Sequence, residues 1–155
     1  MRAFVLYGQG GVLTSFGMNG LANQIAALGV NVTRHNWDDT NNIIATIKNL
    51  DHDEPVVLAG YSLGAGVLTW VSNALPKRRF DLLVAYDPSR WQQQHPPGPN
   101  VSRLMLYHNT QWDLWGNATI PGAQVETTEV HTFHLAVQFD SALHAKTIEA
   151  IKRLT

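Results

Sequence analysis

Short apolar runs alternate along this chain with segments whose apolar residues recur at helical spacing. The strongest run, residues 55–61 (PVVLAGY), is followed by an apolar stripe over residues 67–75, and the same alternation continues on both sides. Continuous apolar strands separated by helices are typical of a parallel sheet covered on both faces. The sequence therefore predicts an α/β protein, a three-layer sandwich around a mostly parallel sheet of about six strands.

The individual elements follow from the same periodicities. The expected strands are residues 3–7, 30–33, 55–61, 81–86, 103–107 and, with less certain alternation, 124–130. The expected helices cover residues 21–28, 43–50, 67–75 and the chain after Asp140, with Gly29 and Pro76 as stop signals. A length of 155 residues predicts a single domain over residues 1–155.

Composition excludes several classes of protein. Only 15% of the residues are charged, the formal net charge is −1, and no basic stripe exists, which argues against nucleic acid as a partner. The absence of cysteine rules out a disulfide scaffold and thiolate metal sites. No apolar stretch approaches the ~20 residues of a membrane span. The N-terminal apolar run is too short for a signal peptide, so we expect a cytoplasmic protein; its oligomeric state is not predicted.

A glycine–serine motif follows the strongest expected strand. Residues 60–64 read GYSLG, which matches G-x-S-x-G, and a helical stripe begins at Val67. In a nucleophile elbow the chain turns sharply from strand to helix, and the serine at the turn takes a strained conformation. The flanking glycines keep side chains out of the tight turn. The pattern therefore predicts Ser62 as a nucleophile exposed at the carboxyl edge of the sheet.

A serine nucleophile needs a base, and the base needs an acid that orients it. His131 and His134 both lie between the last expected strand and the last helix, where a base is needed. We favour His134, because more loop separates it from the strand, and His131 remains the alternative. His144 falls within the last helical pattern and is expected on the surface of that helix.

Two aspartates are candidates for the orienting acid. Asp87 directly follows the strand over residues 81–86, and Pro88 restricts the turn after it. Asp113 lies six residues beyond the next strand, where it is expected to be a solvated loop residue. Both loops open at the same edge as Ser62. We favour Asp87 because its carboxylate is held more tightly at a strand end, with Asp113 as the alternative.

A tetrahedral intermediate needs two backbone N–H donors. One is expected from Leu63, the residue after the nucleophile, and the other from the glycine-rich turn after the first strand (GQGG). In that turn Gln9 is the favoured donor and Gly10 the next. The turn does not match G-x-G-x-x-G, and no G-K-[ST] follows, so a phosphate site is disfavoured.

The chain resembles the α/β-hydrolase superfamily, in a small form similar to lipases and thioesterases. The resemblance rests on the elbow GYSLGAG, the turn LYGQGG and the C-terminal HLAV…IEAIKRL, and it covers almost the whole length. The segment VAYDP resembles small serine hydrolases and thioesterases that place the acid at this strand, which favours Asp87. Many other members carry the acid one strand later, which keeps Asp113 open.

The resemblance implies a minimal α/β-hydrolase core without a lid, which begins at the third strand of the full fold. Residues 88–101 are then the only candidate cover for the active site. Trp91, Trp112 and Trp115 fall in loops at the active edge, where they either line an acyl pocket or pack over the sheet edges.

The sequence thus predicts a serine hydrolase that cleaves a small carboxylic ester or thioester through an acyl-enzyme, and that needs no metal or cofactor. Ser62, His134 and Asp87 form the expected triad, and a shallow site without a lid favours short or medium acyl groups. The alternatives are a thioesterase acting on a carrier-bound acyl group and a non-catalytic binding module that keeps the elbow as scaffold.

Overall fold

A computed structural model describes residues 1–154, which form one parallel sheet of six strands flanked by helices. The strand order is β2-β1-β3-β4-β5-β6, and every neighbouring pair is parallel. The strands are β1 (Arg2–Tyr7), β2 (Asn31–Asn36), β3 (Val56–Tyr61), β4 (Leu82–Tyr86), β5 (Leu104–Asn109) and β6 (Val125–Val130).

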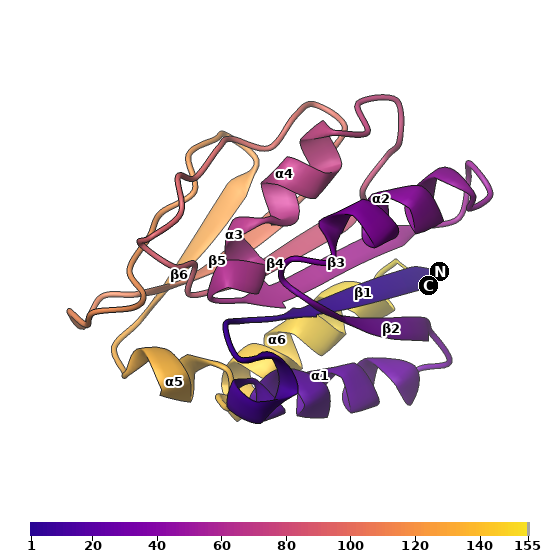
Figure 1. The fold of residues 1–155 in the computed structure, drawn as a ribbon. Coiled ribbons are helices and arrows are strands. Elements are labelled where there is room, and N and C mark those ends of the chain that lie inside the picture. Colours follow the sequence, from indigo (N-terminus) through magenta and orange to yellow (C-terminus); the bar gives the residue numbers. More distant parts are fainter. Residues whose placement is uncertain (155) are drawn as a thin grey trace.

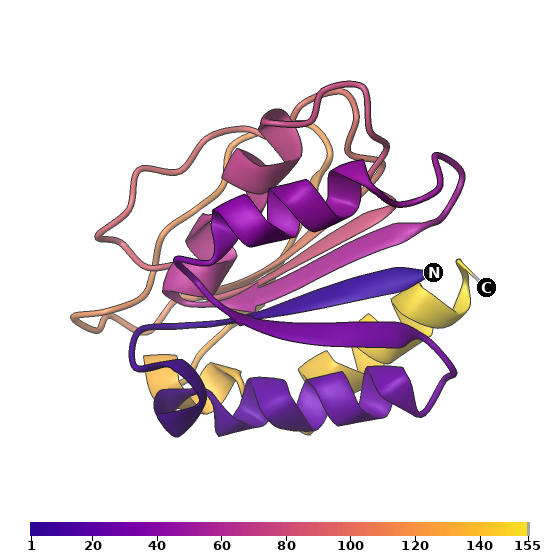
Figure 2. The same cartoon turned by 45° about the vertical axis from the view of Figure 1, so that its right-hand side comes forward.

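Helices cover both faces of the sheet, as Figure 1 and the turned view in Figure 2 show. They are η1 (Gly11–Thr14), α1 (Phe16–Ala26), α2 (Thr40–Lys48), α3 (Leu63–Gly66), α4 (Leu68–Asn73), α5 (His134–Val137) and α6 (Ser141–Lys152). One core cluster joins α1 and α6 to one face, and a second joins α2, α3 and α4 to the other. The predicted three-layer α/β sandwich is therefore confirmed.

Burial along the strands explains their positions in the sheet. All residues of β3 and β4 are buried, as expected for strands covered on both faces, whereas the edge strands β2 and β6 are largely exposed. Because all six strands are parallel, the loops that leave their carboxyl ends meet at one edge of the sheet. That edge faces left in Figure 1, where α3 and α5 lie.

Most predicted elements agree with the structure to within a few residues, and the differences lie in the helices. The helix expected over residues 67–75 is α4 (Leu68–Asn73), and a further short helix, α3, which was not predicted, precedes it and ends next to Val67. The short helix α5 was not predicted, because four residues are too few to show a helical period. Gly29 follows α1 with a φ of 81°, in keeping with the predicted stop signal.

None of the helices within residues 1–154 is long and apolar enough to cross a membrane. The cytoplasmic location expected from the N-terminal residues stays a prediction.

Candidate active site

The turn from β3 into α3 holds Ser62 in a conformation that few residues other than glycine adopt. Its φ and ψ are 57° and −119°. A Cβ on Gly64 would lie 2.6 Å from the carbonyl oxygens of Leu6 and Tyr7, and a Cβ on Gly60 would collide with the backbone of Gly64. The two glycines of the motif are therefore required for the close approach of α3 to β1 and β3.

Ser62, His134 and Asp87 lie in a hydrogen-bonded row. His134 Nε2 is 2.9 Å from Ser62 Oγ, and His134 Nδ1 is 2.6 Å from Asp87 Oδ2. All three residues are buried, and Asp87 is fully so. The prediction that Ser62 is exposed is therefore wrong, because the turn and the stacked loops around it leave only 8% of the residue accessible. An ionised carboxylate only accepts hydrogen bonds, so Nδ1 donates to Asp87 and Nε2 is left to accept from the Ser62 hydroxyl. This arrangement fits a base that is ready to take the serine proton.

Asp87 is held from several sides. Its Oδ1 accepts hydrogen bonds from the backbone N–H groups of Asn117 at 2.9 Å and Asn109 at 3.4 Å. Its own N–H donates to the Tyr107 carbonyl at 2.9 Å, and its φ is 43°. The carboxylate is thus fixed at the end of β4 by the loop that follows β5.

Asp113 is not the solvated loop residue that the sequence suggested. Its Oδ2 accepts a hydrogen bond from the backbone N–H of His134 at 2.7 Å, and its Oδ1 accepts from Trp115 and Gly116, both at 2.9 Å. Burial opposes ionisation, but these backbone N–H donors together lower the pKa of Asp113. Asp113 therefore holds the main chain of His134 and folds its own loop, while Asp87 contacts the imidazole.

The ring of His134 is held by Tyr61, the residue before the nucleophile. The two rings stack with centroids 4.9 Å apart, and the Tyr61 hydroxyl donates to the His134 carbonyl at 3.2 Å. Burial, with the nearby Asp87 and Asp113 charges, raises the pKa of Tyr61 well above its ordinary value, so the hydroxyl stays a donor. By contrast, His131 is exposed and has one long contact, 3.5 Å to Thr110 Oγ1.

The backbone N–H groups of Gln9, Gly10 and Leu63 donate to no acceptor within residues 1–154. The turn that carries the first two is held on both sides. The Gly8 N–H donates to Ser15 Oγ at 3.1 Å, and the Thr14 hydroxyl donates to the Gln9 carbonyl. Unpaired donors next to a buried serine are available to bind a negatively charged oxygen.

A cavity of about 340 Å³ opens at Ser62, and Gln9, Gly10, Trp115, His134 and Leu135 contribute to its wall. Trp91 and Trp112 do not line it. Residues 88–101, the expected cover, contribute nothing to the wall either. Its first residues hold the turn at Ser62 from behind the cavity wall, since the Ser89 N–H donates to the Ser62 carbonyl at 3.3 Å. Its later residues lie along α4, where the Gly98 N–H donates to Asn73 Oδ1 at 2.8 Å and Asn73 Nδ2 donates to the Pro96 carbonyl at 3.0 Å.

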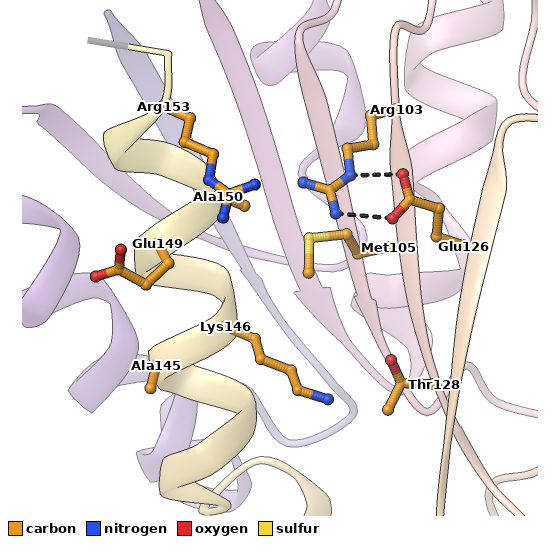
Figure 3. Close-up of a pocket in the computed structure, with 9 residues that line it drawn as sticks. All are labelled: Arg103, Met105, Glu126, Thr128, Ala145, Lys146, Glu149, Ala150 and Arg153. Atoms are coloured by element: carbon orange, nitrogen blue, oxygen red, sulfur yellow. Dashed lines mark hydrogen bonds and ion pairs between the residues drawn. The ribbon is translucent and has the colours of Figure 1, made fainter.

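Two other groups of residues in the molecule resemble binding sites. Nitrogen and oxygen atoms of Asp87, Asp113 and His134 lie within 4.8 Å of one another, but hydrogen bonds to each other and to the backbone already use them. Figure 3 shows a second cavity, of about 390 Å³, between α6 and the strands β5 and β6. There Arg103 is paired with Glu126 through two hydrogen bonds of 2.7 Å, and Ser62 is not part of the wall.

Sequence reasoning missed three parts of this arrangement. It did not assign the stacking of Tyr61, the backbone contact of Asp113, or the need for glycine at position 116. A Cβ on Gly116 would lie 2.6 Å from His134 Nδ1 and closer still to Asp87 Oδ2. The available signal was the spacing of Asn109, Asp113 and Asn117 in one short loop, since such side chains commonly bond to nearby backbone.

Among solved structures, one similar to this chain is the crystal structure of a protein from Xanthomonas campestris pv. campestris, named there as a candidate hydrolase of the alpha/beta superfamily. The two chains superpose with a TM-score of 0.67 over 99% of this chain and 96% of the other, at 19% sequence identity. The chain has the α/β-hydrolase fold. No protein-family model matches the chain, and no curated protein does. At this identity the likeness carries the fold and not the activity.

Proposed function

We propose that the protein is a serine hydrolase that cleaves a carboxylic ester or thioester through an acyl-enzyme. The observation that carries the proposal is the row of hydrogen bonds from Ser62 through His134 to Asp87, with the serine in a strained strand-to-helix turn. The α/β-hydrolase fold supports it, because that fold presents such a serine at the carboxyl edge of its sheet.

In the first half of the reaction, Ser62 Oγ attacks the carbonyl carbon while its proton moves to His134 Nε2. The carbonyl oxygen becomes an oxyanion, which accepts hydrogen bonds from the free N–H groups of Leu63 and Gln9, with Gly10 as the alternative to Gln9. Asp87 keeps the imidazole in its orientation and stabilises the positive charge that forms on it. The intermediate then expels the alcohol or thiol, which takes the proton from Nε2.

In the second half, a water molecule gives a proton to His134 Nε2 and attacks the acyl carbon. Collapse of the second tetrahedral intermediate breaks the bond to Ser62 Oγ, and the proton on Nε2 returns to that oxygen. The acid leaves and the enzyme regains its starting state. Every proton is carried by residues of this chain.

The experiment is labelling with a fluorophosphonate probe, followed by mass spectrometry of the modified peptide. We expect the native protein to be modified at Ser62 and the Ser62→Ala variant not at all. Hydrolysis of p-nitrophenyl butyrate should fall by about 10⁴-fold or more in Ser62→Ala and in His134→Ala. A folded protein that neither reacts with the probe nor hydrolyses the ester would instead support a binding module.

A further inference from the structure

Large apolar side chains are gathered at the edge of the sheet that carries Ser62. Eleven such side chains are exposed within residues 1–154, and ten of them lie in the segments 8–16, 87–103, 110–124 and 131–140, which follow the carboxyl ends of strands. Leu13 is 76% exposed, Trp112 75% and Phe133 67%. The eleventh, Trp70, lies on α4. We call the ten residues the apolar rim.

The apolar rim is continuous with the cavity at Ser62. Two of its members, Trp115 and Leu135, form part of the cavity wall and are still 52% and 60% exposed. The rim is also tied together by the fold. The indole of Trp91 donates to the Leu114 carbonyl at 3.0 Å, and Gln138 on the α5 side joins the chain around Leu13 and Phe16 by donating to the Thr14 carbonyl at 2.8 Å.

Charges are scarce on this edge and mostly negative. The four segments of the apolar rim contain two basic residues, Arg90 and Arg103, and no lysine. Arg103 directly precedes β5, at the opposite edge of the sheet, and is paired with Glu126, which leaves Arg90 as the basic residue near the rim. The same segments contain three carboxylates, that of Asp140 and those of Asp87 and Asp113, which lie beside the imidazole. A ligand that carries phosphate groups, or an anionic membrane, would need cations here. The charge pattern therefore favours an uncharged partner.

Whatever covers the rim must also leave a way for the substrate, because two rim residues, Trp115 and Leu135, form part of the cavity wall. A permanent protein partner, or a second copy of this chain, would close the way to Ser62. On the proposed function, we infer that the apolar rim docks the protein onto the surface of an aggregated, uncharged ester, such as neutral acylglycerol droplets. Its substrates then enter the cavity from that surface, to which the ten rim side chains are exposed.

Binding is tested with trioctanoin droplets and the Ser62→Ala protein, so that hydrolysis does not alter the droplets. We expect the protein to float with the droplets and to remain bound at high salt, because burial of apolar surface is not screened. The triple variant Leu13→Ser, Trp112→Ser, Phe139→Ser changes three rim residues outside the cavity wall. The affinity of this variant for the droplets should be lower by about tenfold or more. The control is Trp70→Ser, which removes an exposed apolar side chain outside the rim and should leave the affinity for the droplets unchanged.

Kinetics separate the docking surface from the catalytic site. With Ser62 in place, the rate on tributyrin should rise sharply once the ester exceeds its solubility and forms droplets. The triple variant should lose that rise while hydrolysing dissolved p-nitrophenyl acetate within about twofold of the native rate. That dissolved-ester rate also shows that the variant is folded; the single Trp112→Ser variant serves if the triple variant does not fold.

Several results would overturn the docking proposal. One is droplet binding by the triple variant as strong as that of the protein with an unchanged rim, and another is a loss of binding in Trp70→Ser as large as in the triple variant. The others are stronger binding to phosphatidylglycerol vesicles than to droplets, and a dimer that the rim substitutions dissociate. Failure of the proposed function looks different, since droplets would be bound but no ester would be hydrolysed and Ser62 would not be labelled. Hydrolysis of dissolved esters without droplet binding would leave the proposed function and reject the docking surface.

Discussion

The row of hydrogen bonds through His134 depends on one residue that carries no functional group. Gly116 lies against the Asp87–His134 hydrogen bond so closely that a Cβ would be 2.6 Å from Nδ1. We expect the added methyl group of Gly116→Ala to displace the imidazole or the carboxylate, because it would lie too close to both, and so to break the hydrogen bond between them. Ester hydrolysis should fall by about 10²-fold or more, because misplacement by an ångström has that effect.

Gly20 provides the matched control for this substitution. It lies within α1, and a Cβ there would meet no heavy atom within 4 Å. Gly20→Ala should leave hydrolysis unchanged and stabilise the protein by about 0.5–1 kcal/mol, measured by urea unfolding. Native-like activity in Gly116→Ala would contradict the geometry around Asp87.

The role of Asp113 is tested by the pH dependence of stability. The N–H donors of Gly116, Trp115 and His134 outweigh burial and lower the pKa of Asp113 in the folded protein. Its contribution to stability is therefore complete above the unfolded pKa of about 3.9 and is lost as the pH falls through the folded pKa. In Asp113→Asn, the free energy of unfolding should fall less steeply with acid below about pH 4.

The readout is the urea midpoint measured at a series of acid pH values. Asp53 is fully exposed, so Asp53→Asn should retain the native slope. An unchanged slope in Asp113→Asn would mean that the carboxylate is not held by the backbone of His134. The catalytic consequence should be smaller than that of Asp87→Asn, because Asp113 contacts the main chain and not the imidazole.

At the scale of elements, the sequence predicted strands well and the helices near the site less well. Each strand is a compact apolar or alternating run that the local pattern reveals. The break at Val67 and the start of α5 at His134 depend on long-range contacts, such as that of α3 with the β1 backbone. His144 was expected on a helix surface but is buried, and both of its ring nitrogens have partners there, Gln24 Nε2 and the Gln138 carbonyl.

The position of α5 depends on the buried side chain of Gln138. Its Nε2 donates to the Thr14 carbonyl at 2.8 Å, and its Oε1 accepts from the Gly17 N–H at 3.1 Å. Gln138→Met keeps the shape and leaves both backbone groups unpaired, so we expect a loss of about 2 kcal/mol or more in unfolding free energy. The exposed Gln93 is the control, since Gln93→Met should cost nothing measurable in the same urea titration. An equal stability of the two variants would show that α5 is held in another way.

The packing of α6 against α1 should become less stable in mild acid, because His144 lies between the two helices. Burial lowers the pKa of His144, against the hydrogen bond to the Gln138 carbonyl and the nearby Asp140, so the folded protein holds the neutral ring. The unfolded chain then takes up a proton first as the pH falls below about 6.5, and stability is lost from there through the folded pKa. His144→Gln should flatten the fall in melting temperature between about pH 7 and pH 5. The exposed His52 is the control, and His52→Gln should keep the native dependence.

At the scale of the whole molecule, parallel strands explain why the candidate site was accessible to sequence reasoning. Ser62, Asp87, Asp113 and His134 come from four segments that each follow a strand, and a parallel sheet brings such segments to one edge. The sequence could not decide which carboxylate reaches the imidazole. That choice depends on the path of residues 109–117, whose own side-chain hydrogen bonds turn Asp113 toward the backbone of His134.

The charge of this edge leads to a prediction about leaving groups. In the four segments of the apolar rim three aspartates face one unpaired basic residue, Arg90, because Arg103 lies at the start of β5 and is paired with Glu126. An anionic leaving group is therefore repelled at the mouth of the cavity. For the same butyryl group, kcat/KM should be lower for butyryl-CoA than for p-nitrophenyl butyrate by about tenfold or more beyond their difference in intrinsic reactivity.

Added salt should reduce this difference in kcat/KM, since screening weakens repulsion between exposed charges. Butyryl-N-acetylcysteamine is the control, because it is a thioester without phosphates and should show no salt effect. A preference for butyryl-CoA that salt abolishes would reverse the argument and favour a thioesterase for carrier-bound acyl groups.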